Sequence, residues 1–150
     1  MKVFLDTNIL LDLLLERDGY EVSAQILQLH DQGEIELCVS ILTMVNVAYV
    51  YQKSVGQHVV IPNLKYLSAI VDVLPMDGNM LQQAIYTNGK DFEDTLQYMC
   101  ALQNQCDVVI TRNTKDFHFS HGLIDPPFKI PVKTPDEFLA ARRMEVAAGQ

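Results

Sequence analysis

Cysteine is scarce in this sequence, and its spacing excludes the common scaffolds that depend on it. The 150 residues contain three cysteines, Cys38, Cys100 and Cys106, and no Cys-x-x-Cys pair. An odd number of cysteines without that spacing argues against a disulfide framework and against a zinc ribbon. Cys38 and Cys100 lie in apolar runs, so we expect them to be small buried hydrophobic residues.

Positive charge is scarce as well. The chain has 11 lysines and arginines against 19 aspartates and glutamates, which gives a net charge of −8 at pH 7. A protein that coats nucleic acid has a basic surface, so this charge balance argues against that class. A nuclease is not excluded, because a carboxylate site is itself negative and binds phosphate through metal ions. Such a site still needs nearby cations, and the candidates are Lys53, Lys65, Lys90, Arg112, Lys115, Arg142 and Arg143.

The sequence has no apolar run long enough to cross a membrane. Its longest candidate, residues 3–15, is interrupted by Asp6 and Asp12, and a membrane-spanning helix needs about 20 apolar residues. The same two acids, with no cleavage-like site after them, argue against a signal peptide. We therefore expect a cytoplasmic protein that does not bind a membrane.

Strand-like and helix-like segments alternate along the chain. Short apolar runs predict strands at residues 2–5, 36–39, 72–74, 107–111 and 129–132. Apolar periodicity and capping residues predict helices at residues 8–15, 20–31, 41–53, 63–70, 78–87 and 92–105, with a last helix after Thr134. This alternation predicts an α/β fold, with a parallel sheet of four or five short strands and helices on both faces.

The length and composition suit one domain. A chain of 150 residues with 49% hydrophobic residues can bury a core without disulfides or a structural metal. We assign residues 1–145 to this domain. We expect residues 146–150 to be a frayed C-terminal tail, as terminal residues often are.

The start of the chain places an acid directly after a strand. Asp6 follows the strand predicted at residues 2–5, and Thr7 and Asn8 suit the beginning of a helix. In parallel α/β sheets, ligands bind at the carboxyl ends of the strands. Asp6 is therefore a candidate metal ligand or catalytic group. The alternative is that Asp6 only caps the helix that follows.

A second acidic group lies at the start of the helix predicted at residues 92–105. Asp91 and Asp94 are three residues apart, so both side chains can point to one side near the helix N-terminus. The helix dipole stabilises carboxylates at that end. A capping box, with Asp91 as the N-cap, explains one of these acids well and the second less well.

The third polar segment is residues 111–117, which contains Asn113 and Asp116 and follows the strongest predicted strand. Three polar segments from distant parts of the chain are thus predicted at one edge of the sheet. Carboxylates brought close together repel one another unless a cation neutralises them. Oxygen ligands of this kind suit Mg²⁺ or Mn²⁺, which can polarise a phosphodiester and activate a water molecule.

With these segments in view, the sequence resembles the PIN-domain ribonucleases, a family that includes the toxins of VapBC toxin–antitoxin pairs. The resemblance is carried, in family order, by residues 3–12, 39–43, 91–95 and 109–117. It implies a three-layer α/β/α sandwich and cleavage of RNA with Mg²⁺ or Mn²⁺. It also implies a separately encoded antitoxin as a protein partner.

The resemblance also implies roles for individual residues. The catalytic acids that bind the metal would be Asp6, Asp94 and Asp116. Thr7 and Thr111 would orient these acids through hydrogen bonds. Further metal contacts and supporting residues would be Asp91, Asn113, Asn8 and Asn46. The nucleophile would be a water on the metal, with no covalent enzyme intermediate.

One position departs from the family pattern. Asn46 stands where the family usually has a glutamate, in the helix predicted at residues 41–53. Asparagine cannot act as a base, and one fewer negative charge weakens Mg²⁺ binding. Two interpretations stay open: an active ribonuclease that manages with three acids, or a catalytically weak module that binds RNA or a protein without cutting. We favour activity because Asp6, Asp94 and Asp116 are all present.

The first helices carry more apolar residues than one buried face requires. These residues are Leu10, Leu11, Leu13, Leu14 and Leu15. A surplus of apolar side chains often marks a partner surface, which would serve a homodimer or an antitoxin. The alternative is a deeply packed helix.

Overall fold

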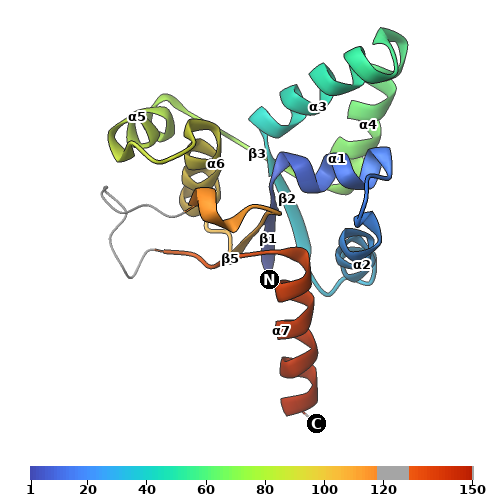
Figure 1. Ribbon diagram of the computed structural model, residues 1–150, viewed down its shortest axis with the longest axis vertical. Helices are drawn as coiled ribbons and strands as arrows, with labels where there is room; N and C mark the ends of the chain where they lie inside the picture. Colours follow the sequence, from blue (N-terminus) through green and yellow to red (C-terminus); the bar gives the residue numbers. More distant parts are fainter. Residues whose placement is uncertain (118–128, 150) are drawn as a thin grey trace.

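Five parallel strands form one sheet in the order β3-β2-β1-β4-β5 (Figure 1). The computed structural model describes residues 1–117 and 129–149. The strands are β1 (Lys2–Leu5), β2 (Glu36–Ser40), β3 (Asp72–Leu74), β4 (Val108–Ile110) and β5 (Val132–Lys133). Every pairing in the sheet is parallel. The α/β class and the small parallel sheet are therefore confirmed.

Helices cover both faces of this sheet, as expected for three α/β/α layers. One face carries α1 (Thr7–Leu15), α2 (Tyr20–Asp31), α3 (Ile41–Ser54), α4 (Val60–Ile70) and α7 (Pro135–Ala148). The other carries α5 (Gly78–Thr87) and α6 (Phe92–Gln103). Two short 3₁₀ helices are η1 (Gln57–Val59) and η2 (Thr114–Phe117). None of the helices in the described residues is long and apolar enough to span a membrane.

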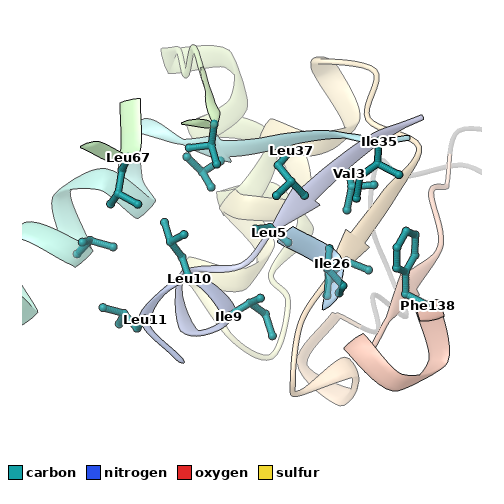
Figure 2. Close-up of a cluster of buried hydrophobic side chains, with 14 of the residues drawn as sticks. Val3, Leu5, Ile9, Leu10, Leu11, Ile26, Ile35, Leu37, Leu67 and Phe138 are labelled. Atoms are coloured by element: carbon teal, nitrogen blue, oxygen red, sulfur yellow. The ribbon is translucent and has the colours of Figure 1, made fainter. Parts of the chain in front are cut away.

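The strands contribute alternate side chains to two cores. In β1, Val3 and Leu5 join the core on the α1 side, where they meet Ile26 and Phe138 (Figure 2). Phe4 points to the opposite core, beneath α6. Burial of both faces explains why the strand sequences are almost continuously apolar. Cys38 and Cys100 are buried free thiols in the second core, as expected.

Several boundaries differ from the prediction. β5 consists of Val132–Lys133 rather than residues 129–132. Pro131 has no N–H to donate to a neighbouring strand, so β5 begins only at Val132. α6 ends at Gln103 because Gln105 has a left-handed φ of 59°. α7 begins with the predicted Thr134 cap and continues to Ala148, so residues 146–148 are helical and not frayed.

The register of the central strands positions the site. Leu5 of β1 is opposite Ile110 of β4, and the Asp6 amide donates a hydrogen bond of 2.9 Å to the Ile110 carbonyl. The residues that follow these two strands therefore lie side by side. Asp6 and Thr111, which are far apart in the sequence, meet at one edge of the sheet.

Candidate active site

An acidic cleft of about 370 Å³ opens at the carboxyl ends of β1 and β4. Its lining consists of Asp6, Asn8, Asp91, Glu93, Asp94, Thr111, Arg112, Asn113 and Asp116. Seven of the nine residues that the sequence singled out line this cleft. The other two, Thr7 and Asn46, are joined to it by hydrogen bonds. The tertiary structure therefore brings the three predicted segments together.

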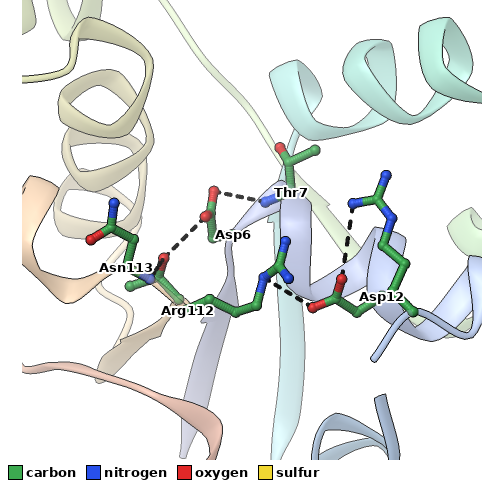
Figure 3. A network of polar contacts seen from close by, with 7 residues as sticks. Asp6, Thr7, Asp12, Arg112 and Asn113 are labelled. Atoms are coloured by element: carbon green, nitrogen blue, oxygen red, sulfur yellow. Dashed lines mark hydrogen bonds and ion pairs between the residues drawn. The ribbon is translucent and has the colours of Figure 1, made fainter. Parts of the chain in front are cut away.

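Asp6 is buried at the base of the cleft, with 4% of its surface exposed. One carboxylate oxygen accepts a hydrogen bond of 2.8 Å from the Thr7 amide, and the other accepts one of 3.1 Å from Thr111 Oγ1 (Figure 3). Burial raises the pKa of Asp6 to about 6, although the Thr111 hydrogen bond opposes this shift. Asp6 thus caps α1 and also presents a destabilised carboxylate to the cleft.

Asp91 and Asp94 have different tasks at the start of α6. Asp91 Oδ1 accepts a hydrogen bond of 2.9 Å from the Asp94 amide, which makes Asp91 the N-cap. Burial and the nearby negative charges, Asp6 first among them, raise the pKa of Asp94 to about 7. The capping interpretation therefore accounts for Asp91, while the Asp94 carboxylate is left to face the other acids.

Glu93 is the acid that the sequence reasoning missed. Carboxylate oxygens of Asp6, Glu93 and Asp94 all lie within 4.8 Å of one another. Glu93 also contributes to the raised pKa of both aspartates through its charge. Two features of the sequence could have indicated Glu93. Glu93 and Asp94 are consecutive acids at the start of α6, and position 46 has an asparagine where the family usually has a glutamate.

A hydrogen-bonded group beneath the cleft joins α1, α3 and α6. The Asn46 amide donates to Glu93 Oε1 at 3.1 Å and approaches Thr7 Oγ1 at 3.4 Å. Gln97 is fully buried, and its amide donates to Thr43 Oγ1 at 2.9 Å and to Thr7 Oγ1 at 3.2 Å. The Thr7 hydroxyl therefore contacts neutral groups in this network, while its backbone amide orients Asp6.

Asn113 and Asp116 form one rim of the cleft. The Asn113 side-chain amide donates a hydrogen bond to the Asp116 carboxylate. Lys90 lies 3.5 Å from the other oxygen of that carboxylate. The Asn113 backbone amide donates to Thr111 Oγ1 at 3.3 Å, which ties the rim to the hydroxyl that also holds Asp6. Asn113 thus positions Asp116 in this arrangement.

The match to known proteins agrees with this geometry. The family model described as the PIN domain matches residues 2–115, a span that holds Asp6, the α6 acids and Asn113. This chain belongs to the PIN-domain family. The resemblance read from the motifs is thereby confirmed, and the acidic cleft is the candidate active site of this PIN domain.

Relatives of this PIN domain include proteins of toxin–antitoxin systems. Ribonuclease VapC1 from Aquifex aeolicus (strain VF5) is 28% identical over 123 residues, which cover 78% of this chain and 84% of the relative. The structure of VapBC-1 from nontypeable Haemophilus influenzae is similar with a TM-score of 0.67 and 19% identity, over 91% of this chain and 99% of that chain. The structure of DNA-bound VapBC from Salmonella typhimurium is similar with a TM-score of 0.66 and 16% identity, over 90% of this chain and 98% of that chain. At these identities the structures show that the fold is shared.

The donor set of this PIN domain fits a divalent cation. Asp6, Glu93 and Asp94 offer only oxygen atoms, the ligands that Mg²⁺ and Mn²⁺ prefer. Burial first, and then repulsion from neighbouring acids, raises the pKa of Asp6 and of Asp94, and a cation between the carboxylates would relieve that repulsion. Among the described residues, no histidine or cysteine lines the cleft.

Proposed function

We propose that this PIN domain is a metal-dependent endoribonuclease that hydrolyses RNA phosphodiester bonds and serves as the toxin of a toxin–antitoxin pair. The observation that carries the proposal is the convergence of the Asp6, Glu93 and Asp94 carboxylates in the cleft of a PIN domain. The likeness to Ribonuclease VapC1 supports the choice of RNA as substrate.

We infer that Asp6, Glu93 and Asp94 hold Mg²⁺ or Mn²⁺ in the cleft, which Asp116 also lines. A divalent metal held by these residues would supply Lewis-acid chemistry, by polarising the phosphodiester and lowering the pKa of a water molecule. Thr111 and the Thr7 amide keep the Asp6 carboxylate in one orientation. Asn113 does the same for Asp116. These contacts preorganise the acids before substrate arrives, which reduces the reorganisation that the reaction requires.

A binding module that does not cut RNA is the second candidate, and Asn46 is the residue that favours it. The neutral amide at this position cannot supply the family's usual carboxylate. However, Glu93 places a carboxylate 3.1 Å from that amide, so the charge absent from α3 is present on α6. This substitution of one carboxylate for another favours the active enzyme.

The protein partner that we propose is an antitoxin, bound in an apolar groove on the α1 side of the sheet. The groove has a volume of about 340 Å³, and its apolar lining includes Leu13, Leu14, Tyr20, Leu27 and Tyr66. The excess of leucines in α1 therefore contributes to a groove as well as to the core. Solved VapBC complexes share this fold, which supports a partner of the antitoxin type.

We also propose a homodimer and a cytoplasmic location. The homodimer proposal rests on large apolar side chains that are exposed on α3 and on α5, among them Val45, Tyr49 and Tyr86. The cysteines at positions 38, 100 and 106 are all free thiols, which suits a reducing compartment. Sedimentation of the purified protein would test the dimer directly.

Cleavage of a mixed RNA pool tests the ribonuclease. The purified protein is assayed with Mn²⁺ or Mg²⁺, with EDTA, and as the Asp6→Asn variant, with circular dichroism to verify folding. Asp18→Asn is the matched control because Asp18 is exposed and does not line the cleft. Metal-dependent cutting that only Asp6→Asn abolishes supports the proposal. A folded wild-type protein that binds RNA and never cuts it supports the binding module instead.

A further inference from the structure

The cleft proposed for RNA has little positive charge to meet a phosphate. Its lining includes five carboxylates, those of Asp6, Asp91, Glu93, Asp94 and Asp116. Among the lining residues in the described part of the chain, Arg112 alone carries a positive side chain. A single divalent cation does not balance five ionised carboxylates, whereas affinity for nucleic acid depends on neutralising phosphates. The positive charge of Arg112 is therefore placed to attract an anionic ligand that enters this acidic cleft.

The side chain of Arg112 is held by a buried acid outside the cleft. Arg112 Nε lies 3.1 Å from Asp12 Oδ2, and Figure 3 shows the side chain reaching from the end of β4 toward Asp12 on α1. Asp12 is 2% exposed. A buried carboxylate is costly to ionise without a charged partner. Burial raises the pKa of Asp12, and the charges of Arg112 and Arg17 oppose that shift.

The ion pair leaves most of the guanidinium available. A guanidinium has five N–H donors, and the contact to Asp12 is made through Nε. The Arg112 side chain is 48% exposed and lines the cleft beside Thr111, whose hydroxyl holds Asp6. The charge of Arg112 also lowers the pKa of Asp6, so its field reaches the centre of the acidic site.

A second arginine shows that Asp12 does not depend on Arg112 alone. Arg17 NH1 lies 3.9 Å from Asp12 Oδ1. Arg17 does not line the cleft. Both arginines therefore contact the buried carboxylate of Asp12. Only Arg112 of the two also lines the cleft proposed for RNA. This difference provides a matched pair of variants with the same change in net charge.

We propose that Arg112 binds a backbone phosphate of the RNA substrate, and that Asp12 is the positioning residue that aims it into the cleft. The inference rests on the proposed ribonuclease function. Asp12 restricts Arg112 before RNA binds, so less side-chain entropy is lost when the phosphate contact forms. The contact is independent of base identity, because a phosphate carries no sequence information.

The test compares Arg112→Gln with Arg17→Gln. For cleavage of a short single-stranded RNA, Arg112→Gln raises KM about tenfold or more, the value of one charge-assisted hydrogen bond or ion pair. Arg17→Gln leaves KM within about twofold, as surface substitutions away from a site usually do. Binding is then measured in an Asp6→Asn background across a range of salt at fixed Mg²⁺. Arg112→Gln reduces the slope of log K against log salt by about 0.7, the contribution of one phosphate contact on a single strand.

Two further variants separate positioning from charge. Asp12→Asn keeps the charge of Arg112 and removes the ion pair that positions its side chain. The KM therefore rises, while the slope of log K against log salt stays at the wild-type value. Arg112→Lys keeps the charge but replaces the planar fork by a single ammonium group, which cannot serve Asp12 and a phosphate in the same geometry. If Arg112→Gln fails to fold, Arg112→Lys decides the matter: a KM at least about threefold higher supports the proposal, and a wild-type KM overturns it.

The outcomes distinguish this inference from the proposed function. Equal KM values and equal salt slopes for Arg112→Gln and Arg17→Gln overturn the phosphate contact and leave Arg112 as a neutraliser of Asp12. A wild-type protein that neither binds nor cuts RNA overturns the ribonuclease proposal, and the phosphate contact falls with it. Loss of affinity for Arg112→Gln without a change of slope also overturns the contact.

Discussion

The side-chain amide of Asn46 on α3 donates a hydrogen bond of 3.1 Å to Glu93 Oε1 on α6. The two residues are 47 positions apart in the sequence, and the pairing places a carboxylate beside the one position where this PIN domain lacks the expected glutamate. Glu93 is also within 4.8 Å of the carboxylates of Asp6 and Asp94. A carboxylate from α6 therefore lies beside Asn46 of α3.

Glu93→Gln should weaken metal binding. The change removes one of three converging carboxylates, and we expect the Mn²⁺ affinity to fall about tenfold or more, with cleavage falling in parallel. Isothermal titration calorimetry with Mn²⁺ measures the affinity without reference to activity. Glu21→Gln, at an exposed position on α2, is the control. Unchanged Mn²⁺ binding in Glu93→Gln would show that Glu93 is not a ligand.

The exchanged pair Asn46→Glu with Glu93→Gln should recover what the single change loses. The double variant returns a carboxylate to α3 and leaves an amide on α6, so the charge of the site is restored. We expect the Mn²⁺ affinity of the double variant to lie within about threefold of the wild-type value, which is at least about threefold tighter than that of Glu93→Gln alone. A double variant as weak as Glu93→Gln alone would contradict the equivalence of the two positions.

The metal-free protein should lose stability as pH rises through neutrality. The pKa of Asp6 is raised to about 6 and that of Asp94 to about 7, both above the unfolded value of 3.8. The folded state therefore binds more protons than the unfolded state between these values. The stability that protonation of these two groups confers is fully present below about pH 4 and is lost as pH rises through about 6 to 7.

Melting of the EDTA-treated protein from about pH 5 to pH 8 tests this linkage. Asp94→Asn removes the charge that becomes unfavourable, so its Tm should exceed the wild-type Tm at pH 8. The two proteins should converge toward pH 5. Added Mn²⁺ should raise the wild-type Tm at pH 8 more than at pH 5, because protons compete with the metal for the same oxygens. A pH-independent difference in Tm between the two proteins would refute the assignment.

Gln97→Leu should destabilise the fold through the hydrogen bonds beneath the site. Gln97 is fully buried and bonds to Ser40, Thr43 and Thr7, so its loss leaves buried hydroxyls short of partners. We expect a reduction of about 2–3 kcal/mol in the free energy of unfolding. Urea denaturation measures this, with Gln28→Leu on the exposed side of α2 as the control. A loss below about 0.5 kcal/mol would indicate that the network adds little.

The sequence by itself determined the elements and named most of the residues that line the cleft. Apolar runs, capping residues and turn residues act over a few positions, and they were sufficient to predict β1, α2 and the Thr134 cap of α7. Because strands of a parallel sheet end at a common edge, the strand pattern was enough to place Asp6 and Thr111 near one another. The boundary errors at β5 and α7 are local, since helix and strand ends depend on weak terminal contacts.

The tertiary structure alone decided the partners of these residues. The pairing of Asn46 with Glu93 and of Arg112 with Asp12 depends on how α1, α3, α6 and the end of β4 pack around the sheet. Neither spacing nor periodicity carries that information, because each pair joins side chains from segments that meet only after the sheet has formed. Local sequence could name every acid of the cleft except Glu93, whereas long-range packing decided which carboxylate lies beside Asn46 and which arginine lines the cleft.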